Sequence, residues 1–176
     1  MSSSTPEAAA GSERGADELF RAAVVTVSDS CARGERVDVS GPAVAEFLEK
    51  RRFHIVAREV IPDVQIKIQD LLIQLTQIAR LVVTTGGTGI AERDVTPEAT
   101  RTVCDRILEG VAERMRQEGA KKTTFAALSC GVCGVRGKSL ILNLPGSPKG
   151  AVESLEAVAD LIPHALELLS GNTVHR

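Results

Sequence analysis

"LVVTTGGTGIAERDVTPEA", residues 81–99, joins an apolar run, a glycine-rich loop and a helix start within 19 residues. It opens on Leu81-Val82-Val83, a short apolar run of the kind that forms a buried strand. The chain then passes through Gly86-Gly87-Thr88-Gly89 and reaches Thr96-Pro97, where a helical pattern begins. A strand that leaves through glycines into a helix is typical of a parallel α/β sheet whose strand ends approach a ligand closely.

The same alternation of strand and helix runs through most of the chain. Strands are predicted at 22–27, 54–57 with 60–61, 81–85 and 139–144; helices are predicted at 41–51, from about 63 to 80, at 96–107, 110–118 and 152–169. Pro163 should kink or restart the last helix. This order predicts an α/β fold, a three-layer α/β/α sandwich with a mostly parallel sheet. Residues 1–20, rich in Ser, Ala, Gly and Glu, are expected to be a disordered tail, and 21–176 a single domain.

The composition argues against several classes of protein. A net charge of −2 and the lack of Tyr and Trp disfavour a nucleic-acid surface, which needs clustered cations and stacking platforms. No apolar run approaches the ~18 residues that would span a membrane, and the N-terminus does not resemble a secretory signal. We therefore expect a cytoplasmic protein with no nucleic-acid or membrane partner. Four cysteines without framework-like spacing fit a reducing compartment.

Four predicted strand ends carry unusual loops, and in a parallel sheet these ends converge at one edge. The loops are Ser28-Asp29-Ser30, Pro62-Asp63, Thr85-Gly86-Gly87-Thr88-Gly89, and Pro145-Gly146-Ser147-Pro148-Lys149. Glycine amides beside a helix N-terminus suit an anion such as phosphate, and Thr85 and Thr88 add hydroxyl donors. The alternative for the glycine loop is a tight structural turn. The second Gly/Ser/Pro loop favours ligand binding.

Asp63 and Asp94 each follow a predicted strand. Paired carboxylates beside a phosphate cradle typically hold Mg²⁺ between ligand oxygens. The alternative is that each aspartate caps a helix N-terminus. Ser28, Asp29, Ser30 and Asp38 either contact polar ligand groups or satisfy loop backbone. Ser40 is expected to cap the helix that follows it.

Cys130 and Cys133 form a single CxxC motif. A zinc site would need two further ligands, and a redox pair is expected near the amino end of a helix. We therefore expect both residues to be free thiols.

Three motifs, taken together and in this order, resemble one family. They are "VTVSDS" with the downstream "SGP", "TTGGTG" with "RDVTPEAT", and "LNLPGSPKGA". They are similar to those of the molybdopterin adenylyltransferases, which include bacterial molybdenum cofactor proteins and the N-terminal domain of gephyrin. The resemblance extends from about residue 22 to 171. It implies a homotrimeric enzyme that uses Mg²⁺ and ATP to adenylylate molybdopterin and releases pyrophosphate, with other molybdenum cofactor enzymes as further partners.

The resemblance also assigns residues. The family's two important aspartates fall on Asp63 and Asp94, as catalytic residues and Mg²⁺ ligands. Its serine-rich loop falls on residues 28–30, and its Pro-Gly-Ser-Pro loop on residues 145–148, both of which would bind molybdopterin or nucleotide. The sequence departs from the family at Cys130, where Arg is common, and Arg136 or Lys138 is a candidate substitute.

Two other functions stay open. One is the related molybdate-inserting transferase, whose loops more often read "GGVS" and "PGNP"; Thr88-Gly89 and Ser147 speak against it. The other is a pterin-binding or scaffolding module without catalysis, which the presence of both aspartates disfavours.

Overall fold

The structure, a computed structural model, describes residues 20–171. A six-stranded sheet has the order β2-β1-β3-β6-β5-β4. The first four strands of that order are parallel, and β5 and β4 are antiparallel to their neighbours. The strands are β1 (Arg21–Val27), β2 (His54–Ile61), β3 (Leu81–Thr85), β4 (Arg106–Ile107), β5 (Cys133–Arg136) and β6 (Ser139–Leu144).

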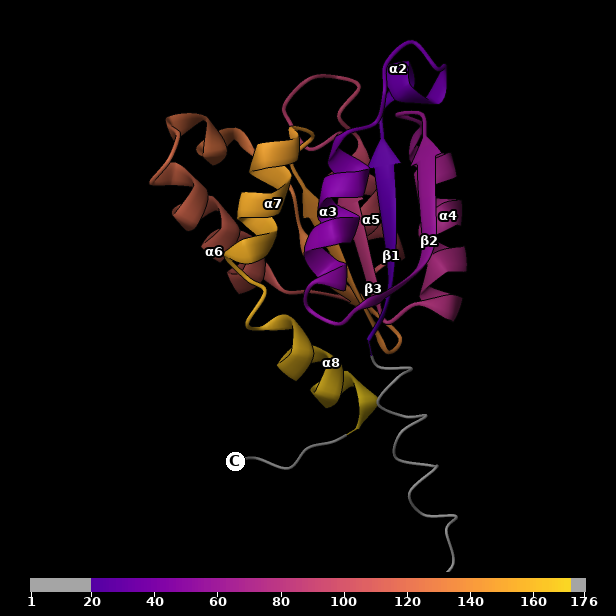
Figure 1. Ribbon diagram of the computed structural model, residues 1–176, viewed down its shortest axis with the longest axis vertical. Helices are drawn as coiled ribbons and strands as arrows, with labels where there is room; N and C mark the ends of the chain where they lie inside the picture. The colour runs from indigo at the N-terminus through magenta and orange to yellow at the C-terminus, as the bar shows by residue number, and fades with distance from the viewer. Residues whose placement is uncertain (1–19, 172–176) are drawn as a thin grey trace, which may run out of the picture.

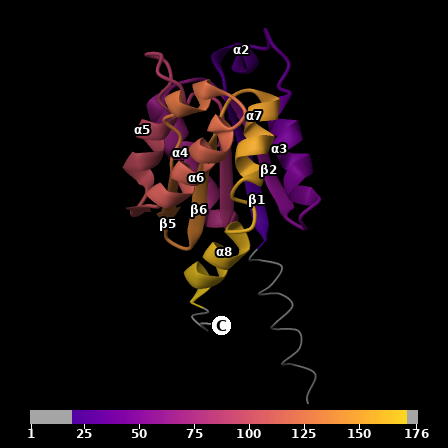
Figure 2. The ribbon, with the colours of Figure 1, turned by 90° about the vertical axis from the view of Figure 1, so that its left-hand side faces the viewer.

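Helices cover both faces of the sheet (Figures 1 and 2). They are α2 (Asp29–Ala32), α3 (Ser40–Glu49), α4 (Gln65–Ile78), α5 (Thr96–Val103), α6 (Glu109–Ala120), α7 (Pro148–Glu156) and α8 (Ile162–Ser170), with a 3₁₀ helix at Thr124–Leu128. Apolar residues of α3, α6, α7 and α8 pack on one face of the sheet, and those of α4 and α5 on the other. The predicted three-layer fold with a mostly parallel sheet is therefore confirmed.

Successive side chains of the central strands point to opposite faces of the sheet, which is why both faces need a layer of helices. Val24 of β1 packs into the cluster with α3 and α7, whereas Val25 packs into the cluster with α4 and α5. Both side chains are at most 1% exposed. A strand buried on both faces reads as a continuous apolar run, which is why the sequence shows these strands so clearly.

The main departures from the predicted elements lie at the antiparallel edge of the sheet. β4 and β5 were not predicted from the sequence, and the helix that begins at residue 96 was predicted to continue into β4. That helix ends at Val103, because Arg106 and Ile107 pair with β5 instead. The last predicted helix is two helices, and α8 restarts with Pro163 in its first turn, as predicted.

The predicted cap at Ser40 is wrong. The first turn of α3 is held by Asp38, whose Oδ1 accepts a hydrogen bond from the Gly41 amide at 3.0 Å. The predicted tail at 1–20 lies outside the described residues except for its last position. No helix within residues 20–171 is long and apolar enough to cross a membrane.

Candidate functional site

A cavity of about 390 Å³ lies at the carboxyl ends of the parallel strands. Register brings these ends together, because Thr26 of β1 pairs with Thr85 of β3, and Thr85 pairs with Leu144 of β6. In Figure 1 this is the edge to which the β1 arrowhead points and on which α2 sits. The cavity is lined by Thr26, Val27, Ser28, Cys31, Arg36, Val37, Asp38, Val39, Ser40, Asp63, Thr85, Gly86, Gly87, Asp94, Gly146, Ser147 and Pro148.

The glycine loop that follows β3 needs glycine at its first two positions. Gly86 and Gly87 have φ angles of +98° and +64°, which L side chains rarely adopt. A Cβ on Gly87 would lie 2.4 Å from Thr96 Oγ1 and 3.0 Å from Asp63 Oδ1. The buried Thr96 hydroxyl donates to the Gly86 carbonyl at 3.0 Å, and the Thr96 amide donates to the Gly87 carbonyl at 3.1 Å. The start of α5 therefore fixes this loop directly beside Asp63.

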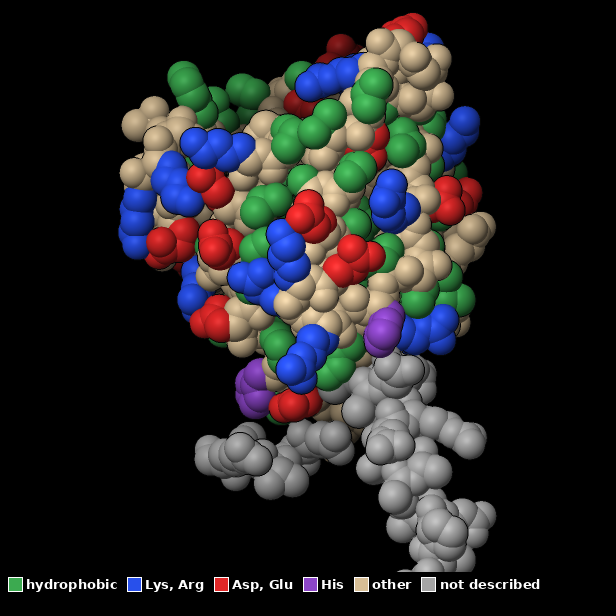
Figure 3. All heavy atoms as spheres, in the orientation of Figure 1, with side chains coloured by type: hydrophobic (Ala, Val, Ile, Leu, Met, Phe, Trp, Pro, Cys, Tyr) green, Lys and Arg blue, Asp and Glu red, His purple; other side chains and the backbone are tan. Residues whose placement is uncertain are grey.

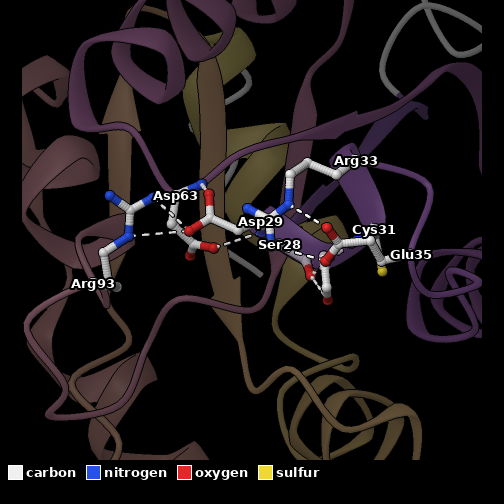
Figure 4. A network of polar contacts seen from close by, with 8 residues as sticks. Ser28, Asp29, Cys31, Arg33, Glu35, Asp63 and Arg93 are labelled. Atoms are coloured by element: carbon white, nitrogen blue, oxygen red, sulfur yellow. Dashed lines mark hydrogen bonds and ion pairs between the residues drawn. The ribbon is translucent and has the colours of Figure 1, made fainter.

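Asp29 and Asp63 join the ends of β1 and β2 through two reciprocal hydrogen bonds (Figure 4). The Asp29 amide donates to Asp63 Oδ2 at 2.8 Å, and the Asp63 amide donates to Asp29 Oδ1 at 3.0 Å. Burial raises the pKa of Asp63, and the negative charges of Asp29 and Asp94 add to that increase. A hydrogen bond from Arg93 lowers the pKa of Asp29. The two carboxylates thus have different electrostatic environments within one linked unit.

Asp63 and Asp94 do not serve as side-chain caps for α4 and α5. The residues at those caps are Val64 and Val95. Asp94 Oδ2 instead accepts from the Ala91 amide at 3.0 Å and so closes a turn in the loop between β3 and α5. Both aspartates line the same cavity, and we infer that their carboxylates are placed for a ligand rather than for capping.

The loop after β6 packs against the glycine loop. The Thr85 hydroxyl, buried, donates to the Pro145 carbonyl at 2.7 Å. Ser147 caps α7 by accepting a hydrogen bond from the Gly150 amide at 3.1 Å. The amino end of α7 therefore adjoins the cavity, and helix amides there favour an anion.

The predicted binding residues divide into two groups. Those that line the cavity are Ser28, Asp63, Thr85, Gly86, Gly87, Asp94, Gly146, Ser147 and Pro148. Asp29, Ser30, Thr88, Gly89, Pro145 and Lys149 belong to the same loops but not to the cavity wall. Asp29 and Ser30 are bonded to residues of the wall, since Asp29 holds Asp63 and the Ser30 and Ser28 hydroxyls lie 3.2 Å apart. Thr88 is buried, and its carbonyl accepts from the Cys130 amide at 2.8 Å.

The segment 36–39 forms one wall of the cavity, and of its residues only Asp38 was a candidate from the sequence; Arg36, Val37 and Val39 were missed. Asp38 attaches this segment to β1, because its Oδ2 accepts a hydrogen bond from the Thr26 hydroxyl at 2.8 Å. Asp38 also accepts a hydrogen bond from the Gly41 amide and lines the cavity, so neither of its two expected roles is excluded. Arg36 brings a cation to the wall, and Val37 and Val39 bring apolar side chains that are 79% and 57% exposed. The signal available in the sequence was the presence of Val37 and Val39 within an otherwise polar loop.

Arg136 and Lys138 cannot replace the arginine that the family commonly has at position 130. Arg136 pairs with Ser139 at the start of β6, and the Arg136 guanidinium donates to the Val103 carbonyl. Both cations therefore lie at the opposite end of the sheet from Pro145. Nearer to Cys130 is Arg116, whose guanidinium donates to the Gly131 carbonyl at 3.2 Å. All four cysteines are free thiols, with Cys130 exposed and Cys133 buried.

A larger hollow, about 750 Å³, lies away from the strand ends beside α3, α6 and α7. Its charges are mixed: the lining includes Arg51, Arg52, Glu118 and Glu156, and Arg114 is paired with Asp160 at 3.1 Å. Figure 3 shows this face of the molecule, where basic and acidic side chains alternate. The glycine loops, Asp63 and Asp94 belong to the smaller cavity, which we therefore take as the candidate site.

Comparisons with known proteins point to one family. Residues 23–164 match the family described as "Probable molybdopterin binding domain". A molybdopterin adenylyltransferase of Helicobacter pylori is 43% identical over 156 residues, spanning 85% of this chain and 87% of that protein. The molybdopterin adenylyltransferase of Escherichia coli K12 is 39% identical over 169 residues, spanning 86% of each.

A solved structure shows the same fold. The molybdopterin biosynthesis enzyme MoaB of Thermus thermophilus superposes with a TM-score of 0.82 at 52% identity, covering 86% of this chain and 97% of that one. The matched region contains all four strand-end loops that build the cavity. The chain belongs to the molybdopterin adenylyltransferase family of molybdenum cofactor biosynthesis proteins.

Proposed function

We propose that this protein adenylylates molybdopterin with Mg-ATP and releases pyrophosphate. The observation that carries the proposal is the placement of Asp63 and Asp94 in one cavity with two loops suited to anions. The names of the relatives supply the reaction, and the site supplies the groups that such a reaction needs. The cytoplasmic location expected from the sequence and the homotrimer implied by the family resemblance belong to the same proposal.

The donor set fits Mg²⁺ as it is usually bound with nucleotides. Within residues 20–171, no three His, Cys, Asp or Glu side chains are grouped closely enough to hold a metal ion by themselves. Mg²⁺ is typically held by one or two carboxylates together with substrate phosphates and water. Asp63 and Asp94 would provide those carboxylates, and Mg²⁺ would neutralise charge on the phosphates during transfer.

The protein's own groups would bind and orient the two substrates. The amides after β3, together with the amino end of α7, would hold phosphate oxygens. The Asp29–Asp63 link would hold the Asp63 carboxylate in one orientation before the ligand arrives. Phosphoryl chemistry of this kind depends mainly on positioning and on charge neutralisation, so a fixed carboxylate is valuable.

The two alternative functions make different predictions. A binding or scaffolding module would hold molybdopterin without consuming ATP. A molybdate-inserting transferase would require an already adenylylated pterin. The loop residues Thr88, Gly89 and Ser147 favour the adenylyltransferase over the second alternative.

The experiment is to incubate the protein with molybdopterin, Mg-ATP and pyrophosphatase, and to analyse the pterin by mass spectrometry. We expect the adenylylated pterin to accumulate. One pyrophosphate, recovered as two orthophosphates after pyrophosphatase, should be released for each AMP transferred. Binding of molybdopterin without ATP consumption would support the non-catalytic alternative and contradict the proposal.

A further inference from the structure

An exposed arginine lies beside the linked carboxylates. The Arg93 guanidinium donates from Nε to Asp29 Oδ2 at 3.0 Å, and Nη2 donates to the same oxygen (Figure 4). The Arg93 side chain is 63% exposed, whereas that of Asp29 is 26% exposed. Arg93 therefore reaches inward from the surface of the loop between β3 and α5.

In the hydrogen-bond network, only Asp29 lies between Arg93 and Asp63. Asp29 Oδ1 accepts from the Asp63 amide, while Asp29 Oδ2 accepts from Arg93. Among the Lys and Arg side chains of residues 20–171, Arg93 alone is hydrogen-bonded to Asp29, Asp63 or Asp94. Arg93 is thus the counter-ion of Asp29, which is itself hydrogen-bonded to Asp63.

This ion pair is suited to exchange. A pair that is largely exposed contributes little to stability, because water and salt screen it. A divalent cation that binds the carboxylates would repel the guanidinium and weaken its hold on Asp29. A polyphosphate that arrives with that cation offers the guanidinium a new partner, since arginine binds phosphate oxygens with charge-assisted hydrogen bonds.

We propose that Arg93 is a positioning residue that exchanges Asp29 for a bound polyphosphate when a divalent cation–polyphosphate complex enters the cavity. The inference rests on the proposed function for its ligand class. It adds a defined role for a residue outside the cavity wall. Arg93 also precedes Asp94 directly, so its movement would be coupled to that carboxylate.

The test breaks the same ion pair from its two ends. Arg93→Gln removes the cation, and Asp29→Asn frees Arg93 while the Asn oxygen can still accept from the Asp63 amide. The matched control is Arg33→Gln, which also removes one positive charge. Arg33 lies near by but is paired with Glu35 at 2.8 Å, and it does not line the cavity. Calorimetric titrations measure the binding of Mn²⁺ alone and of Mn²⁺ with tripolyphosphate, and thermal melting checks that each variant is folded.

We expect the two variants to change binding in opposite directions. Arg93→Gln should bind Mn²⁺ alone about threefold more tightly, because a competing cation is gone, and Mn²⁺-tripolyphosphate roughly tenfold more weakly. Asp29→Asn should bind Mn²⁺ alone more weakly and keep or improve its affinity for Mn²⁺-tripolyphosphate. Arg33→Gln should leave both affinities within about twofold of the wild type.

A purely structural ion pair would give a different pattern. Both variants would then weaken Mn²⁺-tripolyphosphate binding together, or neither would change it, and either result would overturn the exchange. These readouts do not require adenylyl transfer. The two variants could show the expected shifts in affinity while the wild type transfers no AMP. That result would contradict the proposed function and leave the role of Arg93 intact.

Discussion

The glycine loop makes the sharpest prediction about stability and binding together. In Gly87→Ala, the new Cβ would lie 2.4 Å from Thr96 Oγ1 and 3.0 Å from Asp63 Oδ1. The positive φ of Gly87 costs an L residue about 1–2 kcal/mol. Displacing the buried Thr96 hydroxyl from the Gly86 carbonyl adds about 1–3 kcal/mol. The free energy of unfolding should therefore fall by about 2–5 kcal/mol, or roughly 4–20 °C in Tm.

The chain offers a matched control in Gly137. Its φ is +56°, and a Cβ there would meet nothing within 4 Å. Gly137→Ala therefore carries the backbone cost and the unfolded-state entropy gain of the same substitution, but no contact. The difference between the two variants isolates the contact with Thr96 and Asp63, which we expect to be about 1–3 kcal/mol.

The assay is thermal melting of both variants, followed by titration with Mg-ATP. Gly87→Ala should lose most nucleotide binding at temperatures where it is fully folded, because Asp63 is displaced. Gly137→Ala should bind as the wild type does. Equal losses of Tm in the two variants, with normal binding in Gly87→Ala, would refute the reasoning and leave the loop as a simple turn.

Three further predictions concern other parts of the molecule. Asp63→Asn should be at least as stable as the wild type at pH 7. Burial raises the pKa of Asp63 in the folded protein, so protonation of this side chain favours folding. Its contribution to the free energy of unfolding is fully present below the unfolded pKa of 3.8 and is lost as the pH rises through the folded pKa. The extra stability of Asp63→Asn over the wild type should therefore disappear at about pH 4. A variant with a lower Tm than the wild type at pH 7 would contradict this prediction. Alkylation at pH 8 followed by mass spectrometry should modify Cys130 well before Cys104 and Cys133, whose pKa values burial raises to about 11 and about 12; equal rates would contradict the burial of these thiols. Light scattering in dilute buffer should give the mass of a trimer, and a clean monomer would contradict the oligomer expected from the family resemblance.

The sequence predicted best those elements that are buried on both faces. The predicted bounds of β3 and β6 agree with the structure, because Leu81–Thr85 and Ser139–Leu144 are uninterrupted buried runs. The edge strands were missed for the opposite reason. β4 has two residues, and β5 contains Gly134, so neither presents a recognisable period.

The site was predictable as a set of loops but not as a network. Topology alone brings strand ends to one edge, so the involvement of residues 28–30, 62–63, 85–89 and 145–148 could be proposed from the sequence. The reciprocal bonds between Asp29 and Asp63 depend on the register of β1 and β2, which no local pattern reports. The Thr26–Asp38 hydrogen bond, which places residues 36–39 on the cavity wall, also joins residues that are distant in the sequence. No local pattern reports it either.

The most direct test of the central claim is AMP transfer to molybdopterin by the wild type and by Asp63→Asn, with pterin binding and Tm recorded on the same preparations. The wild type should form adenylylated molybdopterin. Asp63→Asn should fold and bind the pterin but transfer AMP ~10²–10³-fold more slowly, because it lacks one of the carboxylates that would hold the charge-neutralising Mg²⁺. Undiminished transfer by Asp63→Asn, or no transfer by the wild type, would contradict the account.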